Sequence, residues 1–142
     1  MFEFMDHTAD VAVRVRSRDA EELFCDAASA VVAILLDLKS SEALVARSSI
    51  PLRLEAEDPE ALLVDFLNEL IFLFDTTGFV ARDLKVTSVH LQSPAHLHGH
   101  LKGETFDPAR HQAKTEIKAA TFHGLELRQG SGWLEVEIVF DL

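Results

Sequence analysis

Two long amphipathic helices restrict the possible folds of this chain more than any other feature. Large apolar side chains recur at helical spacing from residue 23 to residue 35 and form one broad stripe, which we expect to continue to about Leu36. A second stripe of the same kind covers residues 62–74. Each stripe needs an apolar surface to cover it, and one face of a β-sheet provides such a surface.

Capping residues indicate where the two helices begin and end. Asp19 precedes the first helix, and Glu22, three residues later, has the position that completes a capping box. Asp58 followed by Pro59 is a strong start signal for the second helix. Gly78 suits the left-handed residue that closes it. Asp37 falls at the expected end of the first helix, where a carboxylate is unfavourable to the helix dipole.

Alternation of apolar and polar residues predicts strands in the rest of the chain. The expected strands cover residues 11–16, 50–57, 84–91, 96–101, 115–122 and 134–141. The apolar phase changes within residues 84–91, which predicts a β-bulge near Thr87-Ser88. Pro51 places its strand at a sheet edge or at the strand's start. Gly103-Glu104 indicates a turn, and residues 129–132 indicate a hairpin turn.

The order strand, helix, strand, helix and then several strands predicts one α+β domain over residues 1–142. We expect a two-layer domain, with a mixed β-sheet and both α-helices packed on one face. A chain of this length buries a sizeable core without disulfides or metal staples.

Composition narrows the functional classes. Twenty-four acidic and 13 basic residues give a formal net charge of −11, which disfavours strong direct binding to nucleic acid. The same balance fits a basic protein partner, a bound cation, or a solubility function. We expect a cytoplasmic protein with no membrane association, because the sequence contains a single cysteine, no signal-peptide pattern and no membrane-length apolar run.

The polar segment Asp6-His7-Thr8-Ala9-Asp10 leads directly into the first strand. Asp10 falls on the nominally polar phase of that strand, and Asp141 falls on the polar phase of the last strand. If those strand ends meet, both carboxylates and the terminal carboxylate of Leu142 form an all-oxygen cluster, which requires a hard cation, a lysine or a shared proton. Lys118 is one possible counter-charge. The alternative is that all these residues are separate exposed charges.

Other reactive residues carry less information. His96, His98 and His100 share one face of a strand, a spacing that suits zinc or copper, but a solvated strand face is the favoured interpretation. Cys25 has no neighbouring base to lower its pKa, so we interpret it as inert. The sequence contains no Gly-rich phosphate loop and no nucleophile elbow.

A series of short motifs runs along the whole chain: residues 7–10, Leu62-Leu63-x-x-Phe66-Leu67-Asn68-Glu69, Gly103-Glu104, residues 116–119, Thr121, His123, Trp133 and Asp141-Leu142. In their order and spacing, these motifs resemble those of the archease family, the small accessory proteins of RtcB-type RNA ligases. The departures are small: Phe122 stands where the family often has Tyr, and Leu142 where it often has Ile.

This resemblance implies an activator and not an enzyme. The family helps the ligase to charge its active-site histidine with GMP, and so promotes multiple turnover in tRNA splicing and RNA repair. The family's metal site maps onto Asp10, Asp141 and Leu142, with calcium as the expected ion. Lys118 matches a functionally important family lysine, and His7 is expected to support the strand entrance.

Two alternatives remain open. One is a metal-dependent phosphohydrolase that uses His7 as base and Asp10 and Asp141 as ligands. The other is a general chaperone or scaffold that binds unrelated unfolded proteins.

Overall fold

The computed structural model describes residues 1–5, 10–37 and 44–142, and it contains two α-helices and ten β-strands within these residues. The helices are α1 (Ala20–Leu35) and α2 (Pro59–Thr77). The strands are β1 (Phe2–Met5), β2 (Asp10–Ser17), β3 (Leu36–Asp37), β4 (Ser48–Ala56), β5 (Phe79–His90), β6 (Ala95–Thr105), β7 (Gln112–Ala113), β8 (Ala119–Thr121), β9 (Arg128–Gly130) and β10 (Trp133–Asp141).

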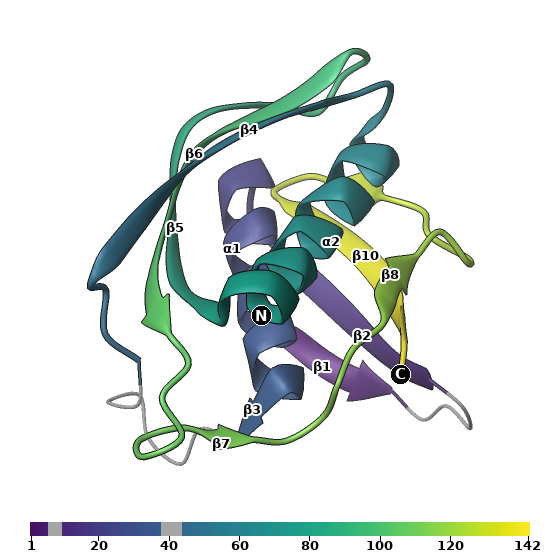
Figure 1. The fold of residues 1–142 in the computed structure, drawn as a ribbon. Coiled ribbons are helices and arrows are strands. Elements are labelled where there is room, and N and C mark those ends of the chain that lie inside the picture. Colours follow the sequence, from purple (N-terminus) through teal and green to yellow (C-terminus); the bar gives the residue numbers. More distant parts are fainter. Residues whose placement is uncertain (6–9, 38–43) are drawn as a thin grey trace.

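The strands form separate antiparallel sheets with the two helices between the larger ones (Figure 1). One sheet has the order β1-β2-β10-β8, with β9 also paired to β10, and another has the order β4-β6-β5. Helix α1 contacts both β2 and β5, while α2 contacts β4, β5 and β8. The predicted α+β class is therefore confirmed. The single mixed sheet with helices on one face is not observed, because each helix carries enough apolar surface to contact a sheet on two sides.

The core lies where the helices meet these sheets. Phe24 of α1 and Phe66 of α2 are fully buried and pack edge to face, with ring centroids 5.3 Å apart. Leu97 and Leu101 of β6 cover the core from one side, and Ile138 of β10 covers it from the other. In the described residues, neither helix combines the length and the hydrophobicity required to span a membrane.

Both helix starts were predicted correctly from their caps. The Asp19 carboxylate accepts a hydrogen bond from the Glu22 backbone N–H at 2.9 Å, and the Asp58 carboxylate accepts one from Ala61 N–H at 2.7 Å. Glu22 does not complete a capping box with Asp19. Its carboxylate instead accepts from the backbone N–H and the guanidinium of Arg18, which offers a charge-assisted bond.

The helix ends differ slightly from expectation. Gly78 closes α2 in the left-handed conformation, with φ of 76°, as predicted. Helix α1 ends at Leu35, and Leu36 and Asp37 form the short strand β3, which pairs with β7. Asp37 is thus outside the helix, so its unfavourable position on the helix dipole does not arise.

Two predictions for the second half of the chain are wrong. Gly103-Glu104 is not a turn but part of β6, where Gly103 pairs with Ser48 on one side and Ala81 on the other. Residues 115–122 do not form one strand, since only β8 pairs with a neighbour. Ile117 is buried between exposed residues, as the alternation indicated, but residues 114–118 do not belong to a sheet.

Other strand predictions are confirmed. β4, which carries Pro51, is an edge strand of its sheet. The register of β5 against β6 shifts between Val86 and Ser88, at the predicted bulge, and a second shift lies between Ala81 and Asp83. The hairpin from β9 to β10 turns at Ser131-Gly132, where Gly132 has φ of 76°.

Candidate functional site

The beginning of β2 and the end of β10 bring two carboxylates together. The strands are antiparallel, and Asp10 lies directly opposite Asp141 in their register. Residues directly opposite in such a pair point to the same face of the sheet, with Cβ atoms about 4.5–5.5 Å apart. The strand ends therefore meet as hypothesised, although most of the chain separates these residues in sequence.

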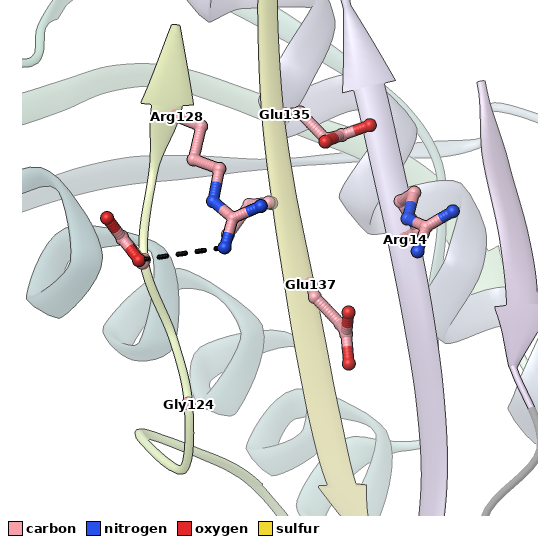
Figure 2. A pocket seen from close by; sticks show the side chains of 7 residues that line it. Arg14, Gly124, Arg128, Glu135 and Glu137 are labelled. Atoms are coloured by element: carbon pink, nitrogen blue, oxygen red, sulfur yellow. Dashed lines mark ion pairs between the residues drawn. The ribbon is translucent and has the colours of Figure 1, made fainter.

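We call each cross-strand pair of residues between β2 and β10 a rung. The other polar rungs on this face pair opposite charges. Glu137 lies opposite Arg14, and Glu135 lies opposite Arg16, with 3.7 Å between a carboxylate oxygen and a guanidinium nitrogen. Figure 2 shows Arg14 on β2 beside Glu135 and Glu137 on β10. The Asp10–Asp141 rung pairs like charges instead. Like charges directly opposite each other destabilise a sheet, so this rung favours a cation in a way that the others do not.

A charged pocket of about 130 Å³ on the same sheet contrasts with this rung. Its lining includes Arg14 and Arg128 as well as three glutamates, and Arg128 is 3.8 Å from the Glu126 carboxylate (Figure 2). Basic side chains therefore accompany the carboxylates in this pocket.

The segment before β8 places Lys118 beside Asp141. The backbone N–H of Lys118 donates to the Asp141 carbonyl oxygen at 2.9 Å. Ile117 is fully buried and anchors the segment, while the Lys118 side chain is exposed. Lys118 therefore starts from a fixed backbone position next to the carboxylates and extends into solvent.

Asn68 of α2 holds this segment in place. Its side-chain oxygen accepts from Ala120 N–H at 2.8 Å, and its side-chain nitrogen donates to the Ala120 carbonyl oxygen at 3.3 Å. This two-bond clamp connects the helix to β8, two residues after Lys118. The sequence indicated Asn68 only as part of a family motif. The signal that could have identified its structural role is a polar amide next to Leu67, which is buried.

The donor set is all oxygen. Asp10 is half-buried, Asp141 is exposed, and Leu142 is 38% exposed. Oxygen donors of this kind suit hard cations such as Ca²⁺ and Mg²⁺ and suit zinc or copper less well. Among the described residues, no three His, Cys, Asp or Glu side chains converge as a metal-binding group.

A cleft of about 320 Å³ adjoins Asp10. It is lined by Phe4, Met5, Asp10, Val11, Ile34, Lys114 and Thr115. Lys114 is held at the cleft by its backbone N–H, which donates to the Leu35 carbonyl oxygen at 2.8 Å. The carboxylate pair thus lies at the edge of a partly apolar cleft.

Two sequence-predicted residues need separate comment. His7 lies outside the described residues. Cys25 is partly buried and its thiol donates to the Leu84 carbonyl oxygen at 3.5 Å. Burial, followed by nearby carboxylates, raises the pKa of the Cys25 thiol to about 11, which supports its interpretation as inert.

Comparison with known proteins identifies the family. The sequence matches the Archease protein family (MTH1598/TM1083) over residues 2–142. The protein archease of Pyrococcus furiosus is 35% identical over 128 residues, which is 90% of this chain and 88% of that protein. The chain belongs to the archease family.

Solved structures agree with this assignment. The solution structure of Methanobacterium thermoautotrophicum protein 1598 superposes with a TM-score of 0.78 at 30% identity, covering 99% of this chain and 98% of that one. The crystal structure of an archease from Thermotoga maritima, described as a possible chaperone, has a TM-score of 0.62 at 21% identity, covering 97% and 94% of the two chains. The second likeness supports the fold alone. None of these three proteins is described as an enzyme.

Proposed function

We propose that this protein is an accessory factor for an RtcB-type RNA ligase. It promotes guanylylation of the ligase's active-site histidine and hence multiple turnover in tRNA splicing and RNA repair. The observation that carries the proposal is the like-charge rung of Asp10 and Asp141, which lies beside Lys118 at one end of the sheet. Membership of the archease family supports this choice of partner, and the like-charge rung supports a bound cation.

In this proposal Asp10, Asp141 and Leu142 hold a divalent cation, for which calcium fits the all-oxygen donors. When bound, the cation supplies fixed positive charge at the edge of the protein. Lys118 adds a second positive charge that extends into solvent from the same place. Together, the cation and Lys118 offset the negative charge of the carboxylates, so this tip of an acidic protein suits the approach to a ligase pocket occupied by a nucleotide.

The remaining charge of the protein supports a protein partner over RNA. A net charge of −11 repels a phosphate backbone and attracts a basic, RNA-binding enzyme. We expect the association with the ligase to weaken as ionic strength rises, because exposed charges are screened over a Debye length of about 10 Å at 0.1 M salt.

The decisive experiment is a guanylylation assay of the ligase with GTP, with and without this chain. Asp10→Ala and Asp141→Asn should abolish the stimulation while circular dichroism and thermal unfolding show a folded protein. Glu137→Gln is the matched control, since Glu137 lies on the same face of β10 but opposite an arginine. Undiminished stimulation by the Asp10→Ala protein would refute the proposal.

A chaperone function is the second candidate, supported by the description of the Thermotoga maritima relative. It predicts suppression of aggregation of unrelated unfolded proteins, with the same activity after Asp10→Ala. The ligase proposal predicts no such general activity. Turnover of nucleotides by the pure protein with divalent cations would instead indicate a hydrolase.

A further inference from the structure

Three histidines gather on the outer face of the β4-β6-β5 sheet, on the opposite side of the helices from the carboxylate rung. In the register of this sheet His96 of β6 lies between Glu55 of β4 and His90 of β5. The His90 and His96 rings are stacked, with centroids 5.9 Å apart, and the His96 and His98 ring centroids are 4.7 Å apart. The spacing in the sequence groups His96 and His98 with His100. The pairing of the strands adds His90 of β5, which the spacing did not indicate.

The bulge in β5 is what brings His90 to this face. Val86 lies opposite Gly99, and without an extra residue His90 would then lie opposite Ala95, whose side chain is buried. The inserted residue, Thr87, shifts the register so that His90 lies opposite His96. Thr87 also donates from its hydroxyl to the His98 carbonyl oxygen at 3.1 Å, which stabilises the shifted strand. Bulges re-aim side chains in this way and are frequent beside functional sites.

Gly99 permits the same arrangement. A Cβ atom at this position would overlap the backbone carbonyl of Lys85, so β5 approaches β6 closely here only because residue 99 is glycine. β6 runs unbroken through Gly99. The glycine and the bulge together set the geometry of the histidine face.

One atom on this face lacks a partner. His98 Nε2 is buried and has no hydrogen-bond partner among the described residues. A buried polar atom without a hydrogen-bond partner is unfavourable, so it calls for a specific explanation such as an ion. The Glu55 carboxylate oxygen is 4.0 Å from this nitrogen, which is too far for a hydrogen bond. Two ligands of one tetrahedral zinc ion lie about 3.4 Å apart, so the exposed Glu55 side chain would need to move closer to share an ion with His98. Ser88 Oγ is 2.7 Å from His96 Nε2 and orients that ring.

We propose that this face is a binding site for a divalent transition-metal ion of the zinc and copper class, with His90, His96 and His98 as ligands and Glu55 as a fourth. Imidazole nitrogen is a preferred ligand of these ions. Among the described residues no such set already converges on one point, so the ion draws exposed side chains together. His90 and Glu55 are both exposed, so their side chains can reach an ion at the surface.

The chemistry of this site differs from that of the carboxylate rung. Neutral imidazole is the form that binds a transition metal, and the histidine face offers ring nitrogens where the carboxylate rung offers only oxygen. Ca²⁺ prefers oxygen donors and should not compete for the histidines. The proposal therefore stands independently of the function proposed above.

The test is a calorimetric titration of the full chain, without an affinity tag, with Zn²⁺ in excess Ca²⁺. We expect one zinc ion per chain. His96→Ala and His98→Ala should each weaken binding by at least the roughly 10–100-fold that loss of an outer-shell partner costs a metal site. His100→Ala is the matched control, because His100 follows on the same face of β6 but lies opposite Lys85 and Pro51. Asp10→Asn should leave zinc binding unchanged.

A second measurement does not depend on variants that could misfold. Imidazole NMR resonances of His90, His96 and His98 should shift or broaden on addition of stoichiometric Zn²⁺, whereas those of His100 should not. Equal shifts of all the histidines, or zinc affinity that survives both His96→Ala and His98→Ala, would overturn the proposal.

Discussion

The carboxylate rung and the histidine face place like side chains opposite each other across antiparallel strands, but by different means. Asp10 and Asp141 meet because the first and last long strands of the chain pair in register. His90 and His96 meet because a bulge shifts the register within one hairpin of β5 and β6. The first arrangement depends on the whole fold, and the second on one inserted residue. This difference predicts which changes disrupt each site separately.

The largest expected effect comes from reversing one charge of the rung. Asp141→Lys converts the rung into an opposite-charge pair like the rungs formed by Glu135 and Glu137. Ligase stimulation and calcium binding should be lost, while stability without calcium should rise by roughly 0.2–1 kcal/mol. Ligase guanylylation, calcium titration and chemical denaturation measure the three quantities.

The matched control is Glu137→Lys, which should have the opposite effect on stability. It places a lysine opposite Arg14 and should destabilise the protein while leaving calcium binding intact. If both lysine variants destabilised the calcium-free protein equally, the like-charge interpretation of the Asp10–Asp141 rung would be wrong.

The next effect concerns the backbone beneath the histidine face. Gly99→Ala places a methyl group against the Lys85 carbonyl and should cost about 1–3 kcal/mol, as overpacking does elsewhere. Because β5 must then move, zinc binding should weaken as well, whereas calcium binding at the far sheet should not change. Urea denaturation and the two metal titrations test this separation; a parallel loss of both metals would contradict it.

A third prediction concerns the clamp behind Lys118. Asn68→Ala removes both hydrogen bonds to the Ala120 backbone and should cost about 1–3 kcal/mol, because backbone groups are left unsatisfied. Ligase stimulation should fall further than calcium affinity, since the clamp holds β8 and Lys118 and not the carboxylates. Asn68→Asp retains the acceptor for Ala120 N–H and should show a smaller loss in both measurements.

The smallest expected effect is a change in the pH dependence of stability. Burial and Arg53 lower the pKa of His98 below its ordinary value of 6.5, so the folded state resists protonation of this ring. His98 therefore contributes stability above pH 6.5, and this contribution is lost as the pH falls through the folded pKa. In the His98→Gln variant, the free energy of unfolding should therefore fall less steeply as the pH is lowered. NMR titration should show a pKa of His98 below its ordinary value of 6.5, and a pKa at or above that value would contradict the assignment.

Local signals in the sequence predicted what depends on nearby residues. The caps at Asp19, Asp58 and Gly78, the edge position of Pro51 and the bulge near Thr87 were all identified correctly. The turn expected at Gly103-Glu104 was wrong, because this glycine serves the close approach of β5 and not a change of direction. The alternation of residues 115–122 was real, but without a neighbouring strand it produced no sheet beyond β8.

The sequence by itself determined the two helices, the α+β class and the family, since these depend on periodicity, capping and the order of motifs. It also identified Asp10 and Asp141 as residues that matter if they meet. Only the tertiary structure decided that they do meet, because strand pairing between distant segments leaves no local trace in the sequence. Only the tertiary structure likewise decided that His90 lies beside His96 and that Asn68 bonds to the backbone of β8. Each of these contacts depends on register, and register is a property of two segments together.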